Sequence, residues 1–517
     1  MIGRSPSHFP GRRTRRFGPL AAAVPALFAC SLACSSSTGT QPAGTFTTYT
    51  TRFAAKANYD LDILFMIDNS SEMNAMQAKL IAQLPTFMQV LEALPMGLPS
   101  VHIAVVSSDM GATSDQSTAI GCSQNGGDNG IFFFAPSGAC TSTTLASGAT
   151  FISDDAEGTS KNFAAADPQG ISTVLQCIAL TGSAGCGFEH QLASIVRALG
   201  ADGAPSPASN VGFLRPDATL GIVILTNEDD CSAPAGTMLY SLNGGQQDLT
   251  NPLGPIANYR CNRFGHLCTD PNGPSPTTLQ QPPLNPPSDA TGAGGAQTLT
   301  LDNCQSNDTD SGMLIPVSQF ISNIKSLKVD PDHQIFVAAI AGPATPYAVK
   351  WFPLGGATAN ELWPEMEHSC GPTTDGSFAD PGVRIAQFVN GFHNGAVSSI
   401  CDNSYASAMS GIAQGIGGVM ASGSRCINVT PHQNALGNPD CVVTNEVTNA
   451  GNAKGIVVRN CLENGGGPPC WTLAPDAATC PDGGLVLTVS ADPDNPNVDG
   501  ILISCEVCQP GVAAPGC

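Results

Sequence analysis

The side chains best placed to bind a ligand lie in the segment 68–72, which reads Asp-Asn-Ser-Ser-Glu. It follows the apolar run 63–67 and precedes a segment whose apolar residues are spaced for one face of a helix. In an open α/β sheet, ligands bind in the crevice at the carboxyl ends of the strands. We therefore expect Asp68 and Ser70 to line such a crevice. The alternative is that they cap the helix by accepting hydrogen bonds from its first N–H groups.

The elements that would position these side chains can be recognised from hydrophobic patterning. The run 63–67 does not alternate, which is typical of a strand buried on both faces of a mostly parallel sheet. Similar runs occur at 101–107, 220–225 and 334–340, with helical patterns between them. Strands that alternate with helices predict an α/β fold, a doubly wound and mostly parallel sheet covered by helices on both faces.

Composition narrows the classes of function. The chain has 517 residues, enough for two or three domains, and a formal net charge of −21, which argues against binding to nucleic acid. Only 12% of its residues are charged, while 56 are Gly and 41 are Pro, so we expect much of the chain to be loop. Its 20 cysteines indicate an oxidising compartment.

The N-terminal segment predicts export and a lipid anchor. Residues 1–33 combine a basic stretch with a short apolar stretch and resemble a bacterial lipoprotein signal peptide. Small residues precede both Cys30 and Cys34, and lipidation at Cys34 leaves an even number of cysteines to pair. Ser35 follows, which favours the outer membrane by resemblance to lipoprotein sorting. A plain secretory signal without lipid is the alternative.

Changes in composition suggest the domain boundaries. We predict a flexible linker at 34–57, an α/β domain at 58–425, and a disulfide-rich module at 426–517. Two long stretches, 110–165 and 231–312, interrupt the α/β pattern as insertions. We expect an edge strand at 131–134 in the first of them.

The cysteine positions suggest a disulfide framework. In the second insertion, we expect Cys231 and Cys304 to close the base. In the C-terminal module, Cys505 and Cys508 have the spacing of a metal or redox pair, but structural disulfides fit an exported protein better. The acidic run 492–500 is interpreted as a turn rather than a calcium loop, since it lacks a closing Glu.

The strand and turn at 61–73 resemble the first strand and metal motif, Asp-x-Ser-x-Ser, of von Willebrand factor type A domains. Asp68 and Ser70 match this motif, and Glu72 stands in place of the second Ser. The segments 187–189 (Gly-Phe-Glu) and 226–231 (Thr-Asn-Glu-Asp-Asp-Cys) are similar to segments of exported myxobacterial lipoproteins with such a domain. The resemblance covers roughly residues 58–425 and implies a von Willebrand A-like, Rossmann-type fold.

The same resemblance implies a degenerate metal site. In metal-binding members, the motif turn, a later Thr and an Asp after the fourth strand hold the ion. Here the Thr position falls on Cys186 and the Asp position on Asn227, with Asp229 and Asp230 just beyond. The resemblance therefore implies four ligands, Asp68, Ser70, Glu72 and Asn227, which would bind Mg²⁺ or Ca²⁺. Use of the fold without metal is the alternative.

Three functions remain open at this stage. The preferred one is a lipid-anchored binding or adhesion protein of the cell envelope that meets a protein or cell-surface partner at the crevice near Asp68. The second is a metal-free structural lipoprotein of the envelope. The third is a secreted hydrolase, although the sequence has neither a His-Glu-x-x-His zinc motif nor a Gly-x-Ser-x-Gly nucleophile motif, so we predict no enzymatic activity.

Overall fold

The structure is a computed structural model. It describes residues 46–54, 59–94, 97–112, 122, 126–134, 145–155, 159–163, 170–241, 248–291, 296–353, 362–422, 425–449, 452–463, 469–475, 480, 484–490, 500–508 and 516. The predicted signal peptide, both candidate lipidation sites Cys30 and Cys34, and residues 491–499 of the acidic run lie outside this part of the chain.

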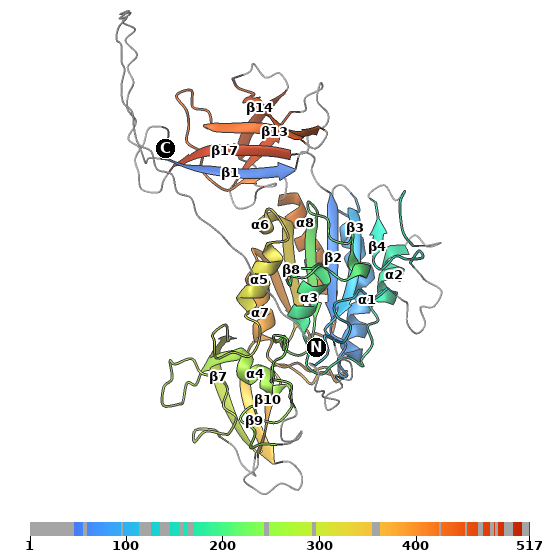
Figure 1. Ribbon diagram of the computed structural model, residues 1–517, viewed down its shortest axis with the longest axis vertical. Coiled ribbons are helices and arrows are strands. Elements are labelled where there is room, and N and C mark those ends of the chain that lie inside the picture. The colour runs from blue at the N-terminus through green and yellow to red at the C-terminus, as the bar shows by residue number, and fades with distance from the viewer. Residues whose placement is uncertain are drawn as a thin grey trace, which may run out of the picture. The chain divides into compact units, whose positions relative to one another are not determined.

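A six-stranded sheet forms the centre of the α/β domain, in the order β11-β8-β5-β2-β3-β4 (Figure 1). All neighbouring pairs are parallel except β3 with the edge strand β4. Read along the chain, the order runs outward from β2 to one edge and then from β5 to the other, which makes the sheet doubly wound with its switch point between β2 and β5. The strands are β2 (Asp60–Ile67), β3 (Ser100–Ser107), β4 (Ile152–Asp154), β5 (Thr219–Leu225), β8 (Ile335–Ala341) and β11 (Asn394–Ser399).

Helices cover both faces of this sheet, as the sequence predicts (Figure 1). The apolar side chains of β2 alternate between two buried clusters, with Phe65 in one and Leu64 in the other. The first cluster includes side chains of α1 (Asn74–Glu92), α2 (Gly170–Ile178) and α8 (Ala406–Ser422). The second includes side chains of α3 (Gln191–Leu199), α5 (Val317–Lys325) and α7 (Val383–Asn390). Two short elements, η3 (Ala208–Asn210) and α6 (Pro331–Gln334), lie in connections.

The second predicted insertion forms part of a four-stranded sheet, in the order β10-β9-β7-β6. Strand β7 pairs with β9, so residues beyond 312 complete this sheet. The expected Cys231–Cys304 closure is wrong, because helix α4 brings Cys261 to Cys231, while pairing of β6 with β7 brings Cys268 to Cys304. The elements are α4 (Tyr259–Gly265), β6 (His266–Thr269), β7 (Gln297–Ser306), β9 (Tyr347–Pro353) and β10 (Leu362–Glu367).

The first predicted insertion supplies an edge strand, but this strand lies at Ile152–Asp154 rather than at 131–134. Residues 131–134 are not a strand, although Phe132 is buried and Phe133 donates its backbone N–H to Val105. The edge strand is β4, which pairs antiparallel with β3. A run of aromatic residues predicted a strand here, but the rings of Phe132 and Phe133 pack into the cores beside the sheet, while Phe134 is exposed.

The C-terminal residues form a seven-stranded sheet, in the order β1-β17-β13-β14-β15-β16-β12. Its strand β1 (Phe46–Ala54) comes from the segment that we predicted as flexible linker, and this part of the prediction is wrong. The strand forms because Phe53 and Tyr49 pack against the apolar core of this sheet, while β17 supplies backbone partners along all of β1. The other strands are β12 (Cys426–Ile427), β13 (Cys441–Asn449), β14 (Asn452–Asn460), β15 (Cys470–Pro475), β16 (Leu485–Val489) and β17 (Gly500–Cys508).

Every cysteine in the described part of the chain is disulfide-bonded. Cys505 pairs with Cys441 rather than forming a metal pair with Cys508, which confirms the structural interpretation of this spacing. The other bonds of the C-terminal sheet include Cys426–Cys480 and Cys461–Cys470, and those of the α/β domain include Cys122–Cys186 and Cys370–Cys401. Among the described helices, none is long and apolar enough to span a bilayer.

Candidate functional site

Asp68 lies at the switch point of the sheet, directly after β2, and its side chain is fully buried. Its Oδ1 accepts hydrogen bonds from the backbone N–H of Ser70 at 2.8 Å and from the hydroxyl of Ser108 at 3.0 Å. Its Oδ2 accepts one from the hydroxyl of Thr226 at 2.7 Å. Ser108 follows β3 and Thr226 follows β5, so three neighbouring strand ends converge on one carboxyl group.

The protonation of Asp68 depends on two opposing effects. Burial raises the pKa of Asp68 above its ordinary value, because a charge is costly away from water. The hydrogen bonds from Ser70, Thr226 and Ser108 lower the same pKa. A divalent cation beside the carboxyl group would favour its ionised form further.

Ser70 occupies the position expected of a ligand rather than that of a helix cap. The N-cap of α1 is Met73, and no side chain caps this helix. The hydroxyl of Ser70 is buried and has no hydrogen-bond partner among the described residues. Because a buried hydroxyl without a partner is costly, this oxygen is suited to a ligand that supplies the missing interaction.

Asn227 lies at the same edge of the sheet, directly after Thr226, and is fully buried. Within the described part of the chain, neither its side-chain oxygen nor its side-chain nitrogen has a hydrogen-bond partner. Its backbone carbonyl accepts from the N–H of Asp380 at 2.9 Å, which fixes the backbone in this position. A carbonyl oxygen that is buried and unsatisfied can serve a hard cation, although it brings no charge.

The two remaining predicted positions behave differently. Glu72 is exposed, and its charge contributes to the raised pKa of Glu228, which places it near the crevice. Cys186, at the family's Thr position, is bonded to Cys122 and offers no thiolate. The loop before it packs tightly on the motif turn, where Gly185 donates its N–H to the carbonyl of Asn69 at 2.8 Å. A Cβ at Gly185 would lie 2.2 Å from the Asn69 side-chain oxygen, so only glycine fits.

The implied ligand set does not include Glu189 and Glu228, which bring further carboxyl groups to the site, although both lie in the segments 187–189 and 226–231 that carry the resemblance. Burial raises the pKa of Glu189 well above its ordinary range, and the charges of Glu228 and Asp68 raise it further. Burial and the charge of Asp380 do the same to the pKa of Glu228. We call Asp68, Glu189, Glu228 and Asp380 together the acidic crevice. Glu228 lies three residues after the end of β5, and Glu189 lies two residues before the start of α3.

Other polar groups hold parts of the acidic crevice in place. The Nδ1 atom of His368 lies 2.7 Å from Oδ1 of Asp380, and this hydrogen bond lowers the pKa of Asp380 against the effect of burial. The amide of Asn258, at the start of α4, donates a short hydrogen bond to Glu228. Glu189 keeps one carboxyl oxygen without a partner among the described residues.

The carboxylates of Asp229 and Asp230 serve structure instead. Asp229 accepts hydrogen bonds from the backbone N–H groups of Arg384 at 2.8 Å and Ile385 at 3.0 Å, at the start of α7. Asp230 accepts from the N–H of Leu192 at 2.9 Å, at the start of α3, and from the Arg384 guanidinium at 2.9 Å. The acidic run that precedes Cys231 therefore satisfies two helix N-termini, where negative charge is favourable.

The residues present fit a hard divalent cation. The side-chain atoms of the implied set that can reach an ion are all oxygens, which Mg²⁺ and Ca²⁺ prefer. The hydroxyl of Ser70 and the amide oxygen of Asn227 are buried without partners among the described residues, and Asp68 lies directly after β2, at the same edge of the sheet. The disulfide at Cys186 removes the position where the family has a Thr, so such an ion would have fewer protein ligands.

Comparison with known proteins gives limited information. No family model matches this chain, and no curated protein matches it. Similar solved structures include an aerotolerance-related membrane protein from Bacteroides fragilis, at 11% identity over 69% of this chain and 98% of that chain, with a TM-score of 0.22. A von Willebrand factor type A protein from Catenulispora acidiphila is 10% identical over 90% of this chain and 66% of that chain, with a TM-score of 0.25.

A third similar structure is the vWF domain of the type V pili tip protein Mfa5 from Porphyromonas gingivalis. It is 15% identical over 69% of this chain and 95% of that chain, with a TM-score of 0.27. Because these TM-scores are low, the fold assignment depends on the strand order and connections described above. These make the chain an α/β protein with a doubly wound, mostly parallel sheet and a separate disulfide-rich β-sheet.

Proposed function

We propose that this chain is an exported binding or adhesion protein that captures a protein or cell-surface partner through a divalent cation in the acidic crevice. The observation that carries the proposal is the pair of buried side-chain oxygens on Ser70 and Asn227 that have no partner among the described residues, at the ends of β2 and β5, which the Asp68–Thr226 hydrogen bond joins. A crevice of four acidic side chains at a topological switch point is suited to a cation, and a cation is suited to an acidic partner.

In this proposal, Asp68, Ser70 and Asn227 hold the ion, and Glu72 adds negative charge at the rim. The ion, when bound, supplies an open coordination position for a carboxylate of the partner. Asp68 orients the site through its bonds to Ser108 and Thr226, which connect it to both neighbouring strands. The extra carboxyl groups of Glu189 and Glu228 favour an ion of double charge and let Ca²⁺ compete with Mg²⁺.

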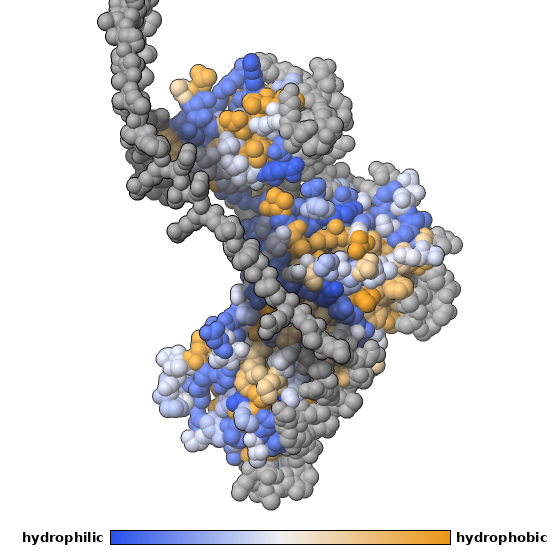
Figure 2. All heavy atoms as spheres, viewed as in Figure 1, coloured by the Kyte–Doolittle hydropathy of each residue, from blue (hydrophilic) through white to orange (hydrophobic). Residues whose placement is uncertain are grey.

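The disulfides support export, because such bonds persist in oxidising compartments. Anchoring at Cys34 would keep the protein on the outer membrane, and mass spectrometry of the mature N-terminus tests this part of the proposal. On the face in Figure 2, hydrophobic side chains lie in small groups among hydrophilic ones.

Calorimetry with Mg²⁺, Ca²⁺ and Mn²⁺ on the purified protein tests the site. Asp68→Ala should abolish binding of the ion at the acidic crevice. Asn227→Asp should tighten binding of the ion, because a charged carboxylate replaces a neutral amide at this position. Capture of an envelope partner should be lost in chelator. No heat with any of the three ions, in wild type or in Asn227→Asp, would contradict the proposal.

A metal-free structural role in the envelope is the second candidate, and one observation favours it. Both carboxyl oxygens of Asp68 already accept hydrogen bonds from protein groups, and Cys186 is held in a disulfide. In that case, partner capture would survive chelator, and Asp68→Ala would lower the stability of the fold without changing the affinity for the partner. Turnover of an ester or peptide substrate would instead favour the third hypothesis, a hydrolase.

A further inference from the structure

A second group of metal-ligating side chains lies in the C-terminal sheet, on residues that backbone hydrogen bonds link in a ring. The N–H of His432 donates to the carbonyl of Glu506 at 2.7 Å, and the N–H of Glu506 donates to the carbonyl of Asp440 at 3.0 Å. The N–H of Asp440 donates to the carbonyl of His432 at 2.7 Å, which closes the ring. The spacing of these three residues is therefore fixed by main-chain bonds rather than by flexible side chains.

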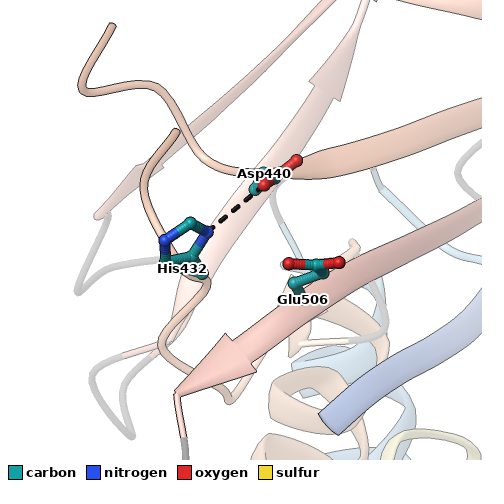
Figure 3. A group of neighbouring side chains, drawn as sticks. All are labelled: His432, Asp440 and Glu506. Atoms are coloured by element: carbon teal, nitrogen blue, oxygen red, sulfur yellow. Dashed lines mark hydrogen bonds and ion pairs between the residues drawn. The ribbon is translucent and has the colours of Figure 1, made fainter. Parts of the chain in front are cut away.

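The three side chains lie close together (Figure 3). One ligand atom from each of His432, Asp440 and Glu506 lies within 4.8 Å of the other two. The side chain of His432 is only 11% exposed, whereas that of Asp440 is 45% exposed and Glu506 is also exposed. The histidine is thus held by its surroundings, and solvent and ions can reach the carboxylates.

The distance between the imidazole and Asp440 fits two ligands of one ion. Nδ1 of His432 lies 3.2 Å from Oδ2 of Asp440, longer than the ~2.7–2.9 Å of a charge-assisted hydrogen bond. Two ligand atoms at about 2.1 Å from a tetrahedral Zn²⁺ lie roughly 3.4 Å apart. The observed spacing is closer to the second value. Nδ1 is the ring nitrogen that faces Asp440.

Neighbouring groups hold the ligands in this geometry. The disulfide between Cys441 and Cys505 joins the residues next to Asp440 and Glu506. The ring of Phe46, from β1, packs on the imidazole of His432 at a centroid distance of 4.3 Å. A site whose ligands are fixed before the ion arrives loses less conformational entropy on binding.

From these observations, we propose that His432, Asp440 and Glu506 form a binding site for a divalent transition-metal ion, with Zn²⁺ as the preferred ion. One imidazole and two carboxylates neutralise the ion and leave a fourth position for water or for an acidic group of a partner. The imidazole favours Zn²⁺ over Mg²⁺ and Ca²⁺, which prefer oxygen ligands. The site is independent of the acidic crevice, since none of its residues belongs to the α/β domain.

The test is titration of the metal-free full-length protein with Zn²⁺, followed by calorimetry, and with Co²⁺, followed by its visible absorption. We expect one Zn²⁺ to bind to Asp68→Ala, in which the acidic crevice is disabled. Glu506→Gln and Asp440→Asn should weaken binding by about 100-fold or more, since even second-shell changes cost about 10–100-fold. Because Glu506 is exposed, Glu506→Gln should keep the fold, and its thermal midpoint without metal should match that of wild type.

Two further variants make the result specific. His333→Ala removes another histidine that bonds an aspartate, Asp330, at 2.9 Å, and it should leave Zn²⁺ binding unchanged. Asp68→Ala, which disables the acidic crevice, should also retain the Zn²⁺ site, so failure of the proposed function and failure of this inference can be told apart. Equal Zn²⁺ affinity in wild type and Glu506→Gln, or no Zn²⁺ binding by Asp68→Ala, would overturn the inference.

Discussion

The hydroxyl of Thr226 donates a 2.7 Å hydrogen bond to Oδ2 of Asp68 and so joins the ends of β5 and β2 at the switch point of the sheet. Asp68 therefore contributes to the stability of the fold as well as to the acidic crevice, because its fully buried carboxyl group needs this hydrogen bond to offset the cost of burial. Ser70 lies on the other side of the same carboxyl group but uses its backbone N–H for the contact, which leaves its hydroxyl for a ligand.

This difference predicts opposite effects for Thr226→Val and Ser70→Ala. Thr226→Val leaves a buried carboxyl oxygen short of a donor and should lower the free energy of unfolding by about 1.5–3 kcal/mol. Ser70→Ala removes a hydroxyl without a partner in the described structure, so it should cost less than about 1 kcal/mol but abolish binding of Mg²⁺. Urea unfolding in chelator and calorimetry with Mg²⁺ measure the two effects. Equal loss of stability in both variants would contradict the assignment of Thr226 to the fold and of the Ser70 hydroxyl to ion binding.

The sequence predicted where this site lies better than it predicted which residues form the site. Asp68 and Ser70 could be found because a buried strand ends abruptly in polar residues, and the structure places both at the switch point. Cys186 could be weighed only as a poor ligand, because its pairing with Cys122 depends on a contact between residues 64 apart in the chain. Glu189 and Glu228 carry no local signal that separates a buried carboxyl group from a surface one.

The buried ion pair of Arg384 and Asp230 predicts a large effect of mutation. Both side chains are fully buried, and the guanidinium also donates to Ser306 and to the carbonyl of Ile315. Arg384→Met would leave the Asp230 charge uncompensated and should lower the free energy of unfolding by about 3–5 kcal/mol.

The matched control for Arg384→Met is Arg52→Met, which breaks a partly exposed pair with Glu446 and should cost no more than about 1 kcal/mol. Urea denaturation of both variants gives the comparison. If the two variants lost the same stability, the Arg384 network would not be part of the core.

The network also links β7, through Ser306, to α7. Removal of residues 231–312 should therefore unfold the α/β domain rather than leave its sheet intact.

Reduction of disulfides should affect the two sheets unequally. The apolar core of the C-terminal sheet is small, and three disulfides, Cys426–Cys480, Cys441–Cys505 and Cys461–Cys470, connect its strands. Removal of a native disulfide from a small domain typically costs about 2–5 kcal/mol. Hydrogen exchange after mild reduction should therefore show loss of protection in β13 to β17 before β2, β5 and β8. The reverse order would show that the disulfides of the α/β domain carry more of its stability.

The same sheet shows where hydrophobic patterning was insufficient. The segment 46–54 has four Thr among its nine residues and continues a stretch rich in Ser, Thr and Gly, so it resembles a linker when the sequence is considered alone. This segment forms a strand because it pairs with β17, near the other end of the sequence, from Phe46 to Ala54. Long-range pairing of this kind leaves no local periodicity, whereas the strands of the α/β domain are buried on both faces and could be predicted from composition alone.

His190 predicts a pH dependence of stability. Its Nε2 lies 2.8 Å from the hydroxyl of Tyr240, and that hydroxyl donates its own proton to the carbonyl of Cys231. Nε2 must therefore be the protonated nitrogen, and Nδ1 is a buried acceptor without a partner among the described residues. A second proton would have to enter at Nδ1 in the same buried place. Accordingly, burial lowers the pKa of His190 from 6.5 to about 4.

A histidine whose pKa is lower in the folded state than in the unfolded state stabilises the fold only while it is neutral. Its contribution is complete above pH 6.5 and is lost as the pH falls toward 4, by up to about 3 kcal/mol. Charged groups also surround this place, since Asp230, Arg384 and Glu189 lie near the Tyr240 hydroxyl. The measurement is therefore a difference, in which urea unfolding of wild type and His190→Gln is compared at pH 7 and pH 4.5. Wild type should lose more stability than His190→Gln between these pH values, and equal losses would show that His190 accepts a proton in the folded state without cost.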